Sequence, residues 1–181
     1  MPDFQHINVK IFARPGSTIN WPSLIPVFHR WIREQATPEL LIDVADYAHV
    51  PAGPGIMVIG HEAHYSVDNR EDRLGAVYNR RAGLDGSTQE RISQAYDAAL
   101  WAARQLENEP EIGGSLKFDE HDVEIWVNDR LLAPSDPETI AKFKSEVSSF
   151  LADRFGSAPD LATSSDPREL VRVRTLAASP R

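Results

Sequence analysis

Apolar and polar residues alternate over residues 7–12, which predicts a strand with one buried face and one face in water. The polar face carries Asn8 and Lys10. Similar runs, apolar on one or both faces, predict further strands at 40–47, at 56–59 with an extension through His61 to Val67, at 74–78 and at 170–175. We also expect a hairpin over 116–127, with a short return strand at 131–132.

Apolar residues that recur at helical spacing predict three helices. The longest covers residues 88–107, where Ser87 and Glu90 form a capping box that satisfies free amides of the first turn. The other two begin near Ser23 and at Asp136, and the last one ends at Gly156.

The order of these elements suggests a weak internal repeat. In each half a strand leads to a helix, then to a Pro-acidic-Leu step at 38–40 or 159–161, and then to another strand. We therefore expect an α+β fold, with a mixed β-sheet, three main helices and two βαββ-like halves packed as one unit. The length favours a single domain over 1–181, with halves 1–86 and 115–176 joined by helix 87–108.

Composition narrows the possible classes. The 181 residues include no Cys, which excludes disulfide-stapled domains and Cys-ligated zinc or iron–sulfur sites. The net charge of -8 disfavours nucleic acid as a partner. No signal peptide is recognisable, and no apolar stretch approaches the ~20 residues that cross a bilayer. We therefore expect a cytoplasmic protein with no membrane partner.

Three segments carry a resemblance to other proteins. Residues 25–32 (IPVFHRWI), 41–47 (LIDVADY) and 128–134 (NDRLLAP) resemble an uncharacterised bacterial protein family. The resemblance implies a free-standing bacterial cytoplasmic protein. It carries over no activity and no functional residue.

Common cofactor and catalytic motifs are missing from the sequence. Neither a dinucleotide fingerprint nor a P-loop occurs, and we predict no cofactor. His61 and His64 resemble the zinc motif His-Glu-x-x-His, but they stand three positions apart where the motif needs four on a helix. One buried and one solvated His is the simpler interpretation, so we predict no metal site.

The best candidate site is a rim formed by strand ends and their loops, where sheets often present polar groups to ligands. A His beside a carboxylate could serve there as a general base. The catalytic candidates are His49, His61, Asp46, Glu62 and Tyr65. The ligand-binding candidates are Asp43, Gly53, Gly55, Arg73 and Arg80. The alternative is that the aspartates accept from loop amides and the glycines only turn the chain.

Arginines outnumber acids locally between residues 70 and 81. Arg70, Arg73, Arg80 and Arg81 face only two acids, at positions 71 and 72. Guanidinium groups suit carboxylates and phosphates, so a small anionic ligand is one interpretation. The other is a solvated loop whose arginines pair with acidic neighbours.

Trp101 lies about 180° around its helix from Ile92, on the polar side. An aromatic residue in that place suggests a homodimer interface, with packing against a neighbouring loop as the alternative. The oligomeric mass of a Trp101→Glu variant decides between them.

These observations support two functions. The first is a non-catalytic small-ligand-binding or assembly module, a homodimer that takes a small polar or anionic ligand. The second is an acid–base enzyme, of the hydrolase or isomerase type, that uses the His–carboxylate cluster in residues 43–65. The enzyme requires these side chains to converge in one pocket.

Overall fold

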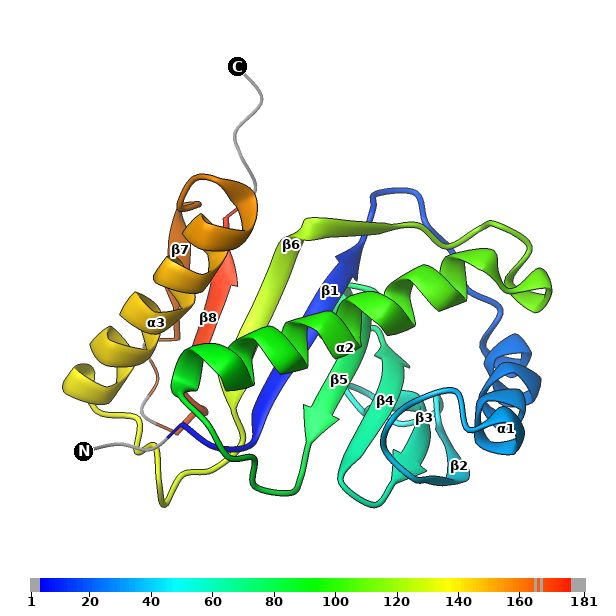
Figure 1. Ribbon diagram of the computed structural model, residues 1–181. Coiled ribbons are helices and arrows are strands. Elements are labelled where there is room, and N and C mark those ends of the chain that lie inside the picture. The colour runs from blue at the N-terminus through cyan, green and yellow to red at the C-terminus, as the bar shows by residue number, and fades with distance from the viewer. Residues whose placement is uncertain (1–3, 165, 167, 177–181) are drawn as a thin grey trace.

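The strands β1 to β8 form one antiparallel sheet with the helices on one face (Figure 1). The computed structural model describes residues 4–164, 166 and 168–176. Within these residues the sheet has eight strands in the order β2-β3-β4-β5-β1-β6-β8-β7, and all neighbouring strands pair antiparallel. The predicted α+β class is thereby confirmed.

The strands are β1 (Ile7–Ala13), β2 (Leu41–Tyr47), β3 (Gly55–Gly60), β4 (Ala63–Asp68), β5 (Gly75–Arg80), β6 (Phe118–Val127), β7 (Leu161–Thr163) and β8 (Arg172–Thr175). The helices are α1 (Leu24–Glu34), α2 (Thr88–Asn108) and α3 (Pro137–Phe155). Short 3-10 turns are η1 (Trp21–Ser23), η2 (Arg70–Asp72) and η3 (Pro110–Ile112).

The caps of the two long helices are those the sequence predicts. Ser87 accepts a hydrogen bond from the backbone N–H of Glu90, whose carboxylate accepts in turn from the N–H of Ser87. The Asp136 side chain accepts from the N–H of Thr139, and Gly156 closes α3 in a left-handed conformation. These local bonds satisfy backbone groups that a helix end leaves free.

Helix α2 crosses the middle of the sheet over β1 and β5, while α1 packs at β2 and β3 and α3 at β7 and β8 (Figure 1). The main core lies between the helices and this face. It includes Val9 and Ile11 of β1, Ile125 of β6 and Tyr96 of α2. This burial of apolar surface is the main force that holds the layers together.

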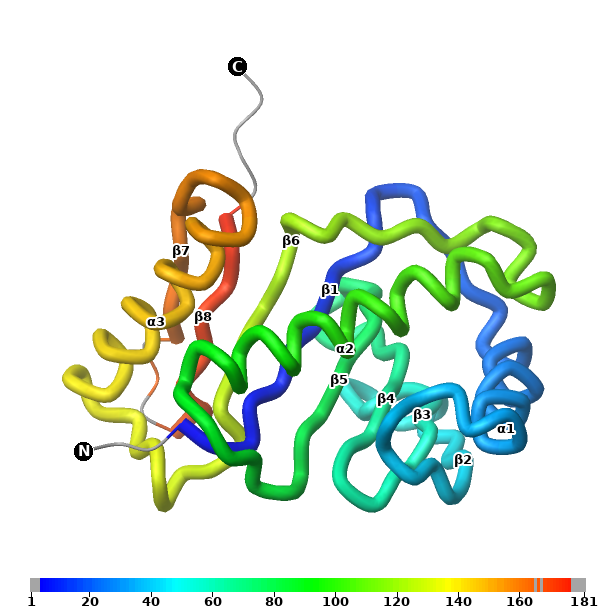
Figure 2. Tube along the Cα trace, viewed as in Figure 1, coloured from blue at the N-terminus to red at the C-terminus, as the bar shows by residue number. Residues whose placement is uncertain are grey.

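Strand β1 lies between β5 and β6, although both come much later in the chain (Figure 2). Its residue Lys10 pairs with Val77 on one side and with Glu124 on the other. The sequence predicts a wet face for Asn8 and Lys10, but both are buried. The Lys10 ammonium is paired with the Asp68 carboxylate of β4, and burial lowers the pKa of Lys10. The face of the sheet without helices therefore buries Lys10 together with an oppositely charged side chain from another strand.

Several predicted strands have different boundaries in the structure. Residues 56–67 form two strands, β3 and β4, joined by a turn at His61 and Glu62. Residues 118–127 form one continuous strand, where we expected a hairpin. The Leu131-Leu132 return strand is wrong: these residues form a turn, in which Asp129 Oδ1 accepts from both amides.

The structure does not show the predicted pair of βαββ halves. Within the described residues, the chain before α2 contributes five strands and the chain after it contributes three. Helix α2 is no mere joint between them, because it packs on β1, β5 and β6. In the same part of the chain, no helix combines the length and apolarity needed to cross a bilayer.

Candidate functional site

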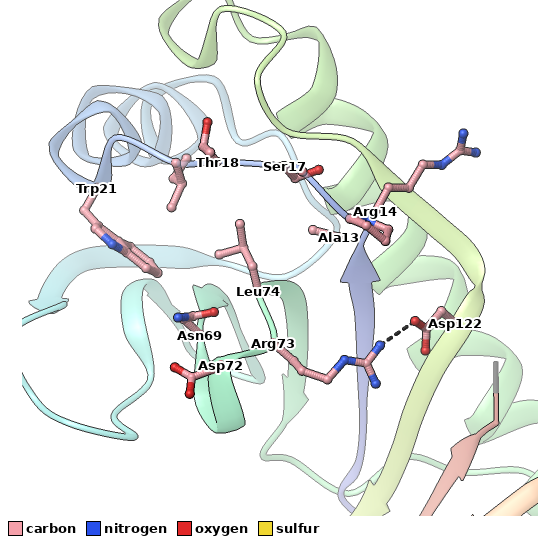
Figure 3. Close-up of a pocket in the computed structure, with 13 residues that line it drawn as sticks. Ala13, Arg14, Ser17, Thr18, Trp21, Asn69, Asp72, Arg73, Leu74 and Asp122 are labelled. Carbon is pink, nitrogen blue, oxygen red and sulfur yellow. Dashed lines mark hydrogen bonds and ion pairs between the residues drawn. The ribbon is translucent and has the colours of Figure 1, made fainter.

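A cavity of about 530 Å³ opens where β1 ends (Figure 3). One wall is the loop between β1 and α1, and the other is the segment between β4 and β5. Its lining includes the side chains of Thr18, Trp21, Asn69, Asp72, Arg73 and Leu74.

The first wall is held by hydrogen bonds to the chain that precedes β6. The N–H of Arg14 donates to Lys117 O at 2.7 Å, and the N–H of Thr18 donates to Ser115 O at 3.0 Å. The Arg14 guanidinium donates to Phe118 O and points away from the cavity (Figure 3). The loop is therefore fixed by backbone contacts, and its cation is directed outward.

The second wall contains two successive residues with left-handed backbone. Glu71 has φ 59° and Asp72 has φ 55°, a region in which L-residues other than Asn and Asp are uncommon. Such local strain is often found at binding sites. It brings Asn69 and Asp72 to the same side of the cavity as Trp21 (Figure 3).

The remaining cation of the cavity is neutralised within the fold. Arg73 forms an ion pair with Asp122 of β6, and its guanidinium lies 3.7 Å from the centre of the Phe12 ring. Burial raises the pKa of Asp122, and the charge of Arg73 opposes that rise. The charge of Arg73 is therefore balanced by Asp122 within the fold.

Four other lining side chains have no such partner. Among the described residues, no hydrogen bond joins the side chains of Thr18, Trp21, Asn69 or Asp72 to another protein group. Together they offer a hydroxyl, an indole N–H, an amide and a carboxylate. The cavity thus combines free donors and acceptors with the apolar surface of Trp21 and Leu74.

The predicted His–carboxylate rim is divided between the two ends of β3. Asp46, near the end of β2, and His49, in the β2–β3 loop, lie at one end of β3, whereas His61 and Glu62 form the β3–β4 turn at the other end. The strand has six residues, so its ends lie about 17 Å apart at the usual rise per residue. Among the described residues, no imidazole makes a hydrogen bond with Asp46 or Glu62.

The two predicted aspartates of β2 are exposed and accept from nearby amides. Asp43 Oδ1 accepts from the N–H of Val44, and Asp46 Oδ1 accepts from the N–H of Ala48 at 2.9 Å. Both aspartates thus accept hydrogen bonds from nearby backbone amides, as in the alternative to a ligand-binding or catalytic role.

Of the two glycines predicted to bind a ligand, Gly55 is required by the backbone. Its φ is +67°, and a Cβ there would lie 1.9 Å from Val67 O on the neighbouring strand. Gly53 lies in the hairpin loop, where its N–H donates to Val50 O. Neither glycine lines the 530 Å³ cavity.

The His61/His64 pair lies at the β3–β4 turn. The N–H of Gly60 donates to His64 Nδ1 at 3.1 Å, and Arg81 Nη1 lies 3.3 Å from His64 Nε2. Burial and the charge of Arg81 lower the pKa of His64. In the described part of the chain, no group of three or more His, Asp or Glu side chains is placed to hold a metal ion.

The two predicted ligand-binding arginines lie at different places. Arg73 lines the cavity, as described. The guanidinium of Arg80 donates to the carbonyls of Ala82 and Gly83 in the following loop. Both guanidinium groups are thus engaged within the chain.

Tyr65 and Trp101 lie together, away from the β1 cavity. Tyr65 is buried and donates its O–H to Glu39 at 2.9 Å. Trp101 packs against Trp31 of α1, with ring centroids 4.9 Å apart. The ring is thus partly covered by its own chain, and the homodimer interface at Trp101 stays a prediction.

Sequence reasoning missed Thr18, Trp21, Asn69, Asp72 and Glu39. The first two follow a Pro-Gly break, where a strand gives way to a loop, and this was the available signal. Asn69 and Asp72 lie far along the chain, and nothing in a single sequence shows that β4 and β5 carry them to the end of β1.

In comparisons with known proteins, no family model, no curated protein and no solved structure matches this chain. Its bacterial origin stays an expectation.

Proposed function

We propose that the protein is a non-catalytic binding module for a small, uncharged, hydroxyl-rich molecule of the saccharide class, held in the cavity at the end of β1. One observation carries the proposal. A cavity of about 530 Å³ presents an indole ring together with side chains that have no partner among the described residues. Its size is within the range of small-molecule sites.

The chemistry of the lining supports this class of ligand. Hydroxyl groups both donate and accept, as do the side chains of Thr18 and Asn69, while Asp72 accepts and the Trp21 indole donates. The C–H face of a sugar ring is apolar and packs well on an aromatic ring such as that of Trp21. Leu74 adds apolar surface between them (Figure 3).

The charges favour an uncharged ligand over an anion. Arg73 is paired with Asp122, Arg14 points outward, and Asp72 is the lining carboxylate without an ion pair among the described residues. Among the described residues, an anion would therefore meet no free guanidinium directed into the cavity, and Asp72 would repel it. The acid–base alternative has no comparable support, because among the described residues no imidazole is hydrogen-bonded to Asp46 or Glu62 and the candidates are divided between the two ends of β3.

Calorimetric titration with a panel of neutral mono- and disaccharides tests this function. We expect binding by the native protein, and Trp21→Ala and Asp72→Asn to lower affinity by roughly tenfold each, through loss of stacking and of a charge-assisted hydrogen bond. Asp43→Asn changes an exposed carboxylate of β2 outside this cavity and serves as the matched control. Absence of saccharide binding, or equal affinities for all variants, would rule the proposal out.

A further inference from the structure

A second cavity, about 390 Å³, lies between α2, strand β4 and the connection from α1 to β2. Its chemistry differs from that of the first cavity, and the two share no lining residue. Alanines and a proline make much of its wall. The functional side chains are Glu39, Tyr65, Gln94, Asp97 and Trp101.

The central feature of this cavity is a buried carboxylate. Glu39 is 7% exposed, and its two oxygens accept from the hydroxyls of Tyr65 and Tyr78, each at 2.9 Å. Gln94 Nε2 donates to the hydroxyl of Tyr78 at 3.0 Å and so supports that donor. A carboxylate has about four acceptor positions, so two donors leave capacity for a ligand.

Within the described part of the chain, this carboxylate has no cationic partner. Among the described residues, no Lys, Arg or His forms an ion pair with Glu39, whereas the buried Asp68 is paired with Lys10. Arg80 is the cation nearest to the tyrosine hydroxyls and lies within hydrogen-bond reach of that of Tyr78, while its guanidinium also donates to the carbonyls of Ala82 and Gly83. It forms no ion pair with Glu39 and does not line the cavity. Buried charges in proteins are ordinarily paired, so this one lacks its usual counterpart.

Aromatic rings form the surface next to the carboxylate. The rings of Tyr65 and Trp101 lie 5.9 Å apart at an interplanar angle of 70°, which makes a corner of two aromatic walls. Trp31 packs behind both, 6.3 Å from Tyr65 and 4.9 Å from Trp101, and its Nε1 is fixed by Glu109. Aromatic faces attract cations through their quadrupole.

We propose that this cavity binds a small organic cation, an ammonium group carried on an apolar body. The Glu39 carboxylate supplies the counter-charge, Trp101 and Tyr65 supply the aromatic walls, and the apolar lining accepts the carbon skeleton.

The rim residue Asp97 adds little net charge, because Arg154 pairs with it at 2.7 Å. A bare metal ion fits poorly, since the described residues hold no cluster of three acidic or imidazole ligands.

The test compares phenethylammonium chloride with its neutral isostere 2-phenylethanol, using calorimetry and tryptophan fluorescence at neutral pH and constant ionic strength. We expect the cation to bind the native protein at least roughly tenfold more tightly than the alcohol, because only the cation gains charge–charge attraction to the carboxylate and cation–π attraction to the rings, whereas the alcohol can donate only a hydrogen bond. Equal affinity for the two probes, or no binding of the cation, overturns the proposal.

Two variants locate the effect. Glu39→Gln keeps the size and two acceptor positions but removes the charge, so it should abolish the preference for the cation and leave binding of the alcohol unchanged. Glu34→Gln, an exposed glutamate on α1, is the matched control. A folded Glu39→Gln protein that keeps the preference contradicts the proposal.

Trp101→Leu gives a second measure that does not depend on the stability of the Glu39 variant. It keeps an apolar wall and removes an aromatic face, so we expect a severalfold loss of cation affinity and a smaller change for the alcohol. Equal losses of affinity for both probes would show that Trp101 contributes only apolar contact, and this outcome would contradict the proposal. Because the cavities share no residue, failure of saccharide binding at the β1 cavity leaves this result unaffected.

Discussion

At the scale of single residues, His64 shows how its surroundings decide what a histidine can do. Its Nδ1 accepts the N–H of Gly60, and the Arg81 guanidinium lies beside its Nε2. Burial and this neighbouring charge both oppose protonation, so the pKa of His64 lies below its ordinary value of 6.5. The imidazole of the folded protein is thereby kept neutral to lower pH than in the unfolded chain.

This shift predicts a pH dependence of stability. Just below 6.5, the unfolded chain binds the proton more readily than the folded one, so the free energy of unfolding falls as the pH drops below 6.5 through the folded pKa. His64→Asn keeps an acceptor for the N–H of Gly60 and should remove this part of the dependence. Urea unfolding at a series of pH values measures it, with His29→Asn, an exposed histidine, as control. An unchanged slope in His64→Asn would contradict the assignment.

Single positions were the hardest to predict from the sequence. Alternation identifies the face of a strand, but it does not reveal that Lys10 meets Asp68 from another strand and is buried with it. Glu39 looks like an ordinary residue of a loop, and its burial follows only from two tyrosines that lie on later strands. Both cases depend on contacts between distant residues, which a local pattern does not contain.

At the scale of elements, the start of β3 leaves no room for a side chain beside β4. Gly55 begins β3 with φ +67°, and a Cβ there would lie 1.9 Å from Val67 O of β4. That carbonyl belongs to the backbone of a paired strand and cannot move aside without disturbing the pairing.

Gly55→Ala should therefore lower the free energy of unfolding by about 2 to 4 kcal/mol, from left-handed strain plus the clash. Gly113→Ala is the matched control, because Gly113 has φ +63° with nothing within 4 Å of its Cβ position. We expect that control to lose only ~1 kcal/mol. Chemical denaturation measures both, and equal losses would show that the close approach has no energetic effect.

Elements with strong local signals were predicted well. Helices α2 and α3 carry their caps within their own sequence, and both are confirmed. Strand β6 was expected to turn at its polar run of residues 119–122, yet it continues. The reason is non-local: Arg73 pairs with Asp122, and the hydroxyl of Tyr96 donates to Glu120 O, so distant groups satisfy this polar stretch.

At the scale of the whole molecule, the sheet is continuous from β2 to β7, and β1 lies within it with a neighbour on each side. The candidate site depends on this topology, because the cavity at the end of β1 takes Trp21 from one segment and Asn69 from another. The rim predicted in residues 43–65 is divided by β3 between the two ends of that strand. The pattern within this segment therefore does not show which distant residues gather at the end of β1.

Hydrogen exchange provides a test at this scale. The amides of β1 are covered on both edges and lie over α2, so we expect them to exchange only through global unfolding and to be among the slowest. Amides of the outermost strands, β2 and β7, should exchange faster. Two separate sets of slow amides with different opening free energies, one before and one after α2, would instead indicate halves that unfold independently.

The position of β1 also has a consequence for synthesis. This strand is translated before either of its neighbours, and Lys10 finds Val77 and then Glu124 only after long stretches of further chain have been made. Until β6 has left the ribosome, one edge of β1 is open to pairing with any other nascent chain. A transcript truncated within α2 should therefore yield a product that depends on chaperones, whereas the finished chain closes that edge itself.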